Sequence, residues 1–213
     1  MKVRQTIFGL LLLLVASLFF STAAADAPIE GRAGRAEVRF LEGMMDHHQM
    51  ALDMSQDCLT KAKTEAVLKM CQDIITAQTA EITTMEEYLL KWYNIDYKPM
   101  PMANMTGIND TSSMSGMSMG ATPTADGMGG MQMPATDPTM MMGMMAGLSR
   151  LEGKEYETAF LESMIDHHDD AVHMSQRLLQ RDPQGHPELL QLAQNIITNQ
   201  TAEIDMMEKM LAE

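Results

Sequence analysis

Two vicinal histidine pairs stand in matching surroundings in the two halves of this 213-residue chain. Segment 40–48 returns as segment 160–168. Each ends in Asp-His-His, with a methionine, Met44 or Met164, three residues before the first histidine. Positions three and four apart share one surface of a helix, so the thioether and the imidazoles can approach a single ion. The repeated motif therefore predicts a metal site in each half. The alternative is a hydrogen-bonded core histidine beside a methionine that only packs.

A second set of methionines lies between the two halves, where residues 100–145 hold fourteen of the 26 in the chain. Thioether sulfur is a soft, neutral ligand that favours Cu(I), and by the same chemistry Ag(I), over hard ions. The alternatives are a linker without function and a sink for oxidants. The candidate ligands in this tract are Met114, Met117, Met119, Met128, Met131, Met133, Met140, Met141, Met142, Met144 and Met145.

The elements that carry the histidines read as helices. From Phe40 to Cys58 and from Cys71 to Leu89, apolar residues recur at steps of three and four, which is typical of a packed helix. Polar residues 61–64 make the turn between them, and residues 181–186 make the corresponding turn of the second half. One helix hairpin cannot bury both of its faces, whereas two can do so together. We therefore predict an all-α fold, a four-helix bundle built from two duplicated antiparallel hairpins.

The expected division of the chain follows from the repeat. Residues 1–25 are a signal peptide, 36–97 the first hairpin, 98–150 a methionine-rich flexible linker and 151–213 the second hairpin. Among larger aliphatic and aromatic side chains, the segment from Met100 to Met145 has only Ile108. We expect it to be disordered because it cannot offset its ordering entropy. Residues 26 to about 35 are expected to be loose as well.

Antiparallel pairing within each hairpin places His48 opposite Glu81 and His168 opposite Glu203. Adjacent helix residues diverge by about a hundred degrees. One histidine of each pair can therefore bind metal while the other hydrogen-bonds the glutamate, and the sequence leaves open which does so. Two further histidines, His173 and His186, have no counterparts and are expected at the surface. The candidate ligands in the bundle are Met44, His47, His48, Met54, Glu81, Met85, Met164, His167, His168, Met174, Glu203 and Met207.

Cys58 and Cys71, the only cysteines, lie on the seams of their helices at equal distances from the first turn. They should face each other, and a disulfide would persist in an oxidising compartment. The alternative is that both remain thiols and bind Cu(I). The second hairpin has Leu178 and Ala193 at these places, so the repeated site does without sulfur there, which favours the disulfide.

The N-terminus reads as an export signal. A basic start, the apolar run from Ile7 to Phe20 and the Ala23–Ala25 site predict a secretory signal peptide cleaved after Ala25. The alternative is an uncleaved membrane anchor, but the apolar run is short for a membrane span of about twenty residues. We expect a periplasmic or secreted protein that is not integral to a membrane. Its formal net charge of −14 excludes nucleic acid as a partner.

The repeated motifs resemble a known family. The two Asp-His-His motifs, the following Ala and Met, and the Gln-x-x-Glu-Ile-x-x-Met of 78–85 and 200–207 resemble the ferritin-like family called domain of unknown function 305. The resemblance covers residues 40–92 and 157–211. With the signal peptide and the methionine tract, the chain is similar to the CopM-type periplasmic copper-binding proteins. This implies a helical bundle that binds Cu(I) and serves copper tolerance, with copper-export components as possible partners.

Two other classes of function compete with this reading. A ferritin-like di-metal oxidase needs Glu-x-x-His on two helices, whereas Met44 and Met164 occupy the positions of those glutamates. A methionine-rich interaction module could instead bind hydrophobic partners. We expect a copper-binding protein that is not an enzyme. Storage and delivery of the metal both remain open.

Overall fold

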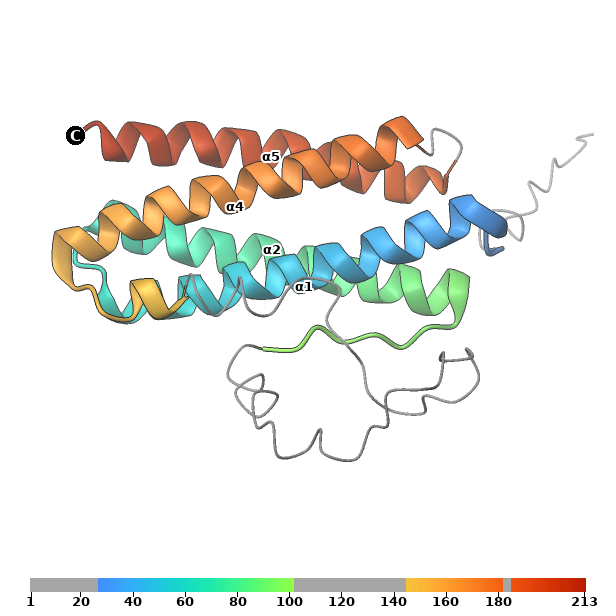
Figure 1. Ribbon diagram of the computed structural model, residues 1–213, viewed down its shortest axis with the longest axis horizontal. Helices are drawn as coiled ribbons and strands as arrows, with labels where there is room; N and C mark the ends of the chain where they lie inside the picture. Colours follow the sequence, from blue (N-terminus) through green and yellow to red (C-terminus); the bar gives the residue numbers. More distant parts are fainter. Residues whose placement is uncertain (1–26, 102–144, 182–184) are drawn as a thin grey trace, which may run out of the picture.

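Four long helices make up most of the computed structural model, which describes residues 27–101, 145–181 and 185–213 (Figure 1). No strand occurs in these described residues, so the predicted all-α class is confirmed. None of the helices found there is long and apolar enough to cross a membrane. The helices are α1 (Gly31–Lys61), α2 (Glu65–Tyr93), α4 (Gly153–Arg181) and α5 (Pro187–Leu211), and residues 145–148 form one further helical turn.

The helices pair as two antiparallel hairpins, α1 with α2 and α4 with α5. Only residues 62–64 separate α1 from α2. Asn94 ends α2 with a φ of 54°, a left-handed conformation that asparagine tolerates. At the start of α5, Pro187 stands in the first turn, where its missing N–H is not needed.

A disulfide closes the first hairpin. Cys58 near the end of α1 bonds to Cys71 near the start of α2, with the two Cα atoms 6.3 Å apart. The predicted pairing is confirmed. In the structure these sulfurs are bonded to each other and are not free thiols for Cu(I).

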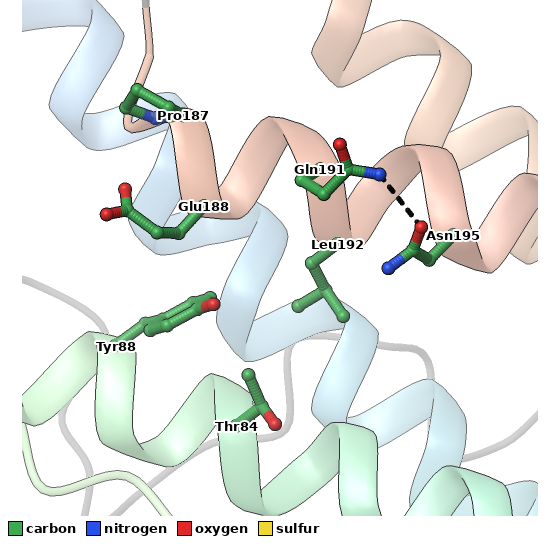
Figure 2. Close-up of a pocket in the computed structure, with 7 residues that line it drawn as sticks. All are labelled: Thr84, Tyr88, Pro187, Glu188, Gln191, Leu192 and Asn195. Carbon is green, nitrogen blue, oxygen red and sulfur yellow. Dashed lines mark hydrogen bonds between the residues drawn. The ribbon is translucent and has the colours of Figure 1, made fainter.

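The two hairpins meet mainly through α1 and α4. Helices α2 and α5 approach each other at one end, where a cleft of about 510 Å³ opens between them (Figure 2). Apart from Glu188, its lining side chains are uncharged, and Gln191 donates a hydrogen bond to Asn195 across one turn of α5 (2.9 Å). The α1–α4 contact, by contrast, runs through the middle of the molecule and brings the repeated motifs together.

The core forms two apolar clusters, one toward each end of the bundle. One gathers the end of α1 with the start of α4 and includes Met54, Cys58, Phe160 and Met164. The other gathers the start of α1 with the end of α4, and includes Phe40 and Met44 beside Leu178. The histidine motifs lie in sequence between these clusters, at the middle of α1 and α4.

Two buried glutamates at equivalent repeat positions link the hairpins. Glu157 on α4 accepts hydrogen bonds from the backbone N–H groups of Lys63 (2.5 Å) and Thr64 (2.7 Å), just before α2. Glu37 on α1 accepts one from the N–H of His186, just before α5 (2.7 Å). Neither N-cap residue, Thr64 or His186, caps its own helix with its side chain. Each hairpin therefore supplies the anionic cap of a helix in the other, which the helix dipole favours.

Several segments expected to be loose are packed. Residues 31–35 belong to α1, and Gly34 is buried so closely that an added Cβ would lie 1.7 Å from the carbonyl oxygen of Ile29. At the ends of the expected linker, Met100 and Met145 pack against the core and Leu148 is buried. The rest of the linker, residues 102–144, lies outside the described residues, as does the signal peptide.

Candidate metal centre

The first histidines of the two repeats meet at the contact between α1 and α4. The ring centroids of His47 and His167 lie 3.6 Å apart, with 33° between the ring planes. Both side chains are buried. The Nε2–H of His167 donates to the backbone carbonyl of His47 (2.9 Å), so its Nδ1 carries the lone pair of the neutral ring. That Nδ1 and both ring nitrogens of His47 are buried without a hydrogen-bond partner.

The second histidine of each pair is oriented by the predicted glutamate. His48 donates from Nε2 to Glu81 (2.6 Å), and His168 donates from Nε2 to Glu203 (2.7 Å). The predicted facing of each histidine and glutamate is confirmed. This contact places a proton on Nε2 of each ring, and Nδ1 of each ring is buried and without a hydrogen-bond partner. A carboxylate that holds one ring nitrogen while the other is left open is the usual support of a metal-binding histidine.

Burial keeps the central pair neutral. The pKa of His47 is lowered to about 3, first by burial and then by the charges that His48 and His168 carry when protonated. The pKa of His167 lies well below the usual 6.5, again first by burial and then by charge on its histidine neighbours. Both imidazoles are therefore neutral at pH 7, the state in which imidazole binds metal.

Methionines flank the histidines on both sides. Met44 and Met85 are fully buried in one apolar cluster, whereas Met164 is fully buried in the other with its partner Met207. The antiparallel register that sets His48 against Glu81 also predicts that Met44 faces Met85 and Met164 faces Met207, and each of these pairs shares a cluster. Repeat symmetry is lost ten residues further along each helix, where Met54 is fully buried but its counterpart, Met174, is partly exposed.

The candidate ligands of the tract divide between two groups. Met145 packs against the core cluster at the end of α1. The others, from Met114 to Met144, lie outside the described residues.

Nowhere in the described ranges do three or more His, Cys, Asp or Glu side chains gather so that they could hold a metal ion. The two rings within a pair diverge, with centroids 6.4 Å apart for His47 and His48 and 6.1 Å for the second pair. Among the described residues, these four residue types alone therefore do not form a site, and a site at the histidines would draw on methionine sulfur.

His186 was expected at the surface, and this prediction is wrong. Its ring is buried and stacks on Trp92, with centroids 3.9 Å apart and 2° between the planes. Glu37 accepts hydrogen bonds from both its Nδ1 (2.6 Å) and its backbone N–H, so a long-range contact buries a residue of the turn. His173 is exposed, as expected.

Four further buried polar side chains, not identified as candidate site residues from the sequence, extend the polar middle of the bundle. Two are serines and two are glutamines, and each type occupies equivalent positions in the two repeats: Ser55 and Ser175, and Gln78 and Gln200. Their hydroxyl and amide groups are buried without hydrogen-bond partners. The Met-Ser-Gln and Gln-x-x-Glu repeats contain these residues, but neither repeat distinguishes a buried polar group from an exposed one.

The fold and this centre define a helical bundle with an internally duplicated, buried cluster of histidine and methionine. The model of the family described as domain of unknown function (DUF305) matches residues 37–211. The chain belongs to this family.

Three solved structures show the same fold. CopM in its Cu(II)-bound form is 28% identical, with a TM-score of 0.54 over 81% of this chain and 93% of that one. A DUF305 fragment from Deinococcus radiodurans is 28% identical, with a TM-score of 0.58 over 83% and 95%. A DUF305 protein from Streptomyces coelicolor is 26% identical, with a TM-score of 0.59 over 83% and 91%. The comparison with curated protein sequences gives no match.

Proposed function

We propose that this protein binds Cu(I), and by the same ligand chemistry Ag(I), outside the cytoplasm. It sequesters copper or hands it over, in the service of copper tolerance, and does not catalyse a reaction. In this proposal the predicted signal peptide directs export, and copper-export components are the partners that would receive the metal.

One observation carries the proposal: four neutral or carboxylate-oriented imidazoles lie in a methionine-rich core with ring nitrogens that have no hydrogen-bond partner. A core histidine that served packing alone would be expected to satisfy its buried nitrogens, because an unsatisfied buried polar group costs about 1–3 kcal/mol. Both ring nitrogens of His47 and the Nδ1 of His167 have no hydrogen-bond partner, and both rings are neutral. A soft ion bound by nitrogen and sulfur would satisfy the lone pair of each ring.

The relatives support the same assignment. CopM has been solved with Cu(II) and, in a structure 25% identical to this chain with a TM-score of 0.53, with bound silver. Silver is a soft monovalent ion, and thioethers prefer such ions. The methionine tract between the repeats supplies more ligands of this kind.

The rival, a ferritin-like di-metal oxidase, has less support from the site. It requires carboxylates that bridge two hard ions. The positions three before the first histidines hold the buried thioethers of Met44 and Met164. The third class, a methionine-rich interaction module, predicts no metal requirement at all.

A competition titration separates these functions. The purified protein would be titrated with Cu(I) under a reductant in the presence of a chromogenic Cu(I) chelator, and with Fe(II) in a parallel experiment. The copper proposal predicts that the protein withdraws Cu(I) from the chelator and binds Fe(II) far more weakly. Equal or tighter Fe(II) binding would favour the oxidase, and binding of neither ion would favour the interaction module.

A further inference from the structure

Helix α1 begins and α4 ends at the same end of the bundle (Figure 1, right-hand end). A pocket of about 760 Å³ lies there, away from the histidine motifs at the middle of these helices. Its lining combines two kinds of side chain. Four are arginines, and the remainder are apolar. The lining residues are Arg32, Ala33, Ala36, Arg39, Phe40, Met174, Arg177, Leu178 and Arg181.

The positive charge of this pocket is out of keeping with the chain as a whole. The protein has a formal net charge of −14, yet five of its seven arginines fall within residues 32–39 and 177–181. All four lining arginines are exposed, and within the described part of the chain none of them forms an ion pair. Like charges held together repel one another, and an anion bound among them would offset that repulsion.

Arginine specifies the kind of anion. The planar guanidinium presents its N–H groups as a fork that matches the two oxygens of a carboxylate or phosphate. Arg39 on α1 and Arg177 on α4 line the same pocket from the two hairpins. Such a pair can hold one oxoanion from two sides.

The floor of the pocket specifies the rest of the ligand. Phe40 and Leu178 are buried there, and Met174 with the two alanines is partly exposed. The volume falls within the range of about 300–1,000 Å³ that is typical of small-molecule sites. The cleft of Figure 2 lacks the positive charge of this pocket, because no basic side chain lines it.

We propose that this pocket binds an amphiphilic organic anion, with its oxoanion head between Arg39 and Arg177 and its apolar body on Phe40, Met174 and Leu178. Met174, a candidate metal ligand in the sequence, is assigned to this pocket instead, where its partly exposed side chain contacts the ligand body. The site uses none of the histidines of the proposed copper centre.

Isothermal titration of the metal-free, full-length protein with decanoate tests the proposal. Decyltrimethylammonium, which has the same chain and a cationic head, is the first control, and acetate, which has the head without the chain, is the second. We expect decanoate to bind and both controls to bind at least about tenfold more weakly, the factor that corresponds to about 1.4 kcal/mol. Equal affinity for the cationic amphiphile or for acetate would overturn the proposal.

Variants locate the site. Arg39→Gln with Arg177→Gln should weaken decanoate binding at least about tenfold, since it removes the charge-assisted hydrogen bonds to the oxoanion. Lys69→Gln with Lys209→Gln removes the same charge from exposed positions on α2 and α5 and should change nothing. Ala36→Glu, which adds a carboxylate to the lining of the pocket and leaves the helix intact, should abolish binding. Wild-type affinity in the double arginine variant or in Ala36→Glu would contradict the assignment.

Discussion

The ring centroids of His47 and His167, which come from opposite hairpins, lie 3.6 Å apart. The backbone carbonyl of His47 also accepts a hydrogen bond from the Nε2–H of His167. Two equivalent positions of a duplicated sequence are thus in contact across the bundle. This contact places the proposed metal sites of the two repeats next to each other, so that a substitution in one hairpin should change the affinity for metal in the other.

The histidines that face glutamate provide the first prediction. Replacing His48 and His168 together by glutamine should abolish Cu(I) binding in the bundle, because it removes two candidate ligands, with metal held by the tract unaffected. Glu81→Gln with Glu203→Gln should weaken Cu(I) binding in the bundle about 10- to 100-fold, because it removes the groups that orient these rings. Chelator competition measures both. His173→Gln, at an exposed position, is the control and should leave affinity unchanged.

The methionine tract provides the second prediction. Changing every methionine between residues 102 and 144 to serine keeps the length of the linker but removes its soft ligands. The number of Cu(I) ions bound should fall, while helix content by circular dichroism and the thermal unfolding midpoint should stay as in the wild type. Undiminished stoichiometry would contradict a collecting role, and loss of helix would show that the tract belongs to the core.

The cross-hairpin cap provides the third prediction. Glu157→Ala should lower the free energy of unfolding by about 2 kcal/mol, since it removes charge-assisted hydrogen bonds to the start of α2. Urea unfolding measures this loss. Glu162→Ala, which alters an exposed residue of the same helix, should cost less than about 0.5 kcal/mol.

The same carboxylate predicts a pH dependence. Burial alone would raise the pKa of Glu157, but hydrogen bonds from Thr64 and Lys63 outweigh it and lower the pKa below the usual 4.5. As the pH falls, the unfolded chain therefore takes up the proton first. The stabilisation is complete above about pH 4.5 and is lost as the pH falls through the folded-state pKa. The gap in unfolding free energy between wild type and Glu157→Gln should accordingly be wide at pH 7 and narrow toward about pH 3.

The disulfide provides the fifth prediction. Cys58→Ser with Cys71→Ser should destabilise the protein by about 3 kcal/mol in the chain-entropy view of a loop of this size. Cu(I) stoichiometry and affinity should not change, because the sulfurs are bonded to each other. A lower stoichiometry in this variant would mean that the cysteines take part in binding after all.

Periodicity within a hairpin was enough to predict its internal contacts. The antiparallel register that set His48 against Glu81 follows from the turn position and the helical repeat, and the structure has this contact. One error of register remained: the steps of three and four that start at Cys71 predict Ile75 on the buried seam of α2, whereas its neighbour Ile74 is the buried residue.

Contacts between hairpins could not be predicted in this way. Periodicity says which face of a helix is buried but not which element of the other hairpin covers it. The burial of His186 depends on Glu37 and Trp92, and both are far away in the sequence. The arginine pocket has the same origin, because it forms only where the start of α1 meets the end of α4.

X-ray absorption at the copper edge tests the central claim most directly. The sample is the variant without tract methionines, loaded with less than one equivalent of Cu(I) so that only the bundle holds metal. Mixed ligation by nitrogen and sulfur around Cu(I), lost in the variant with His48→Gln and His168→Gln, is the predicted result. Copper bound by nitrogen and oxygen alone, or no copper retained by the bundle, would contradict a buried histidine–methionine centre.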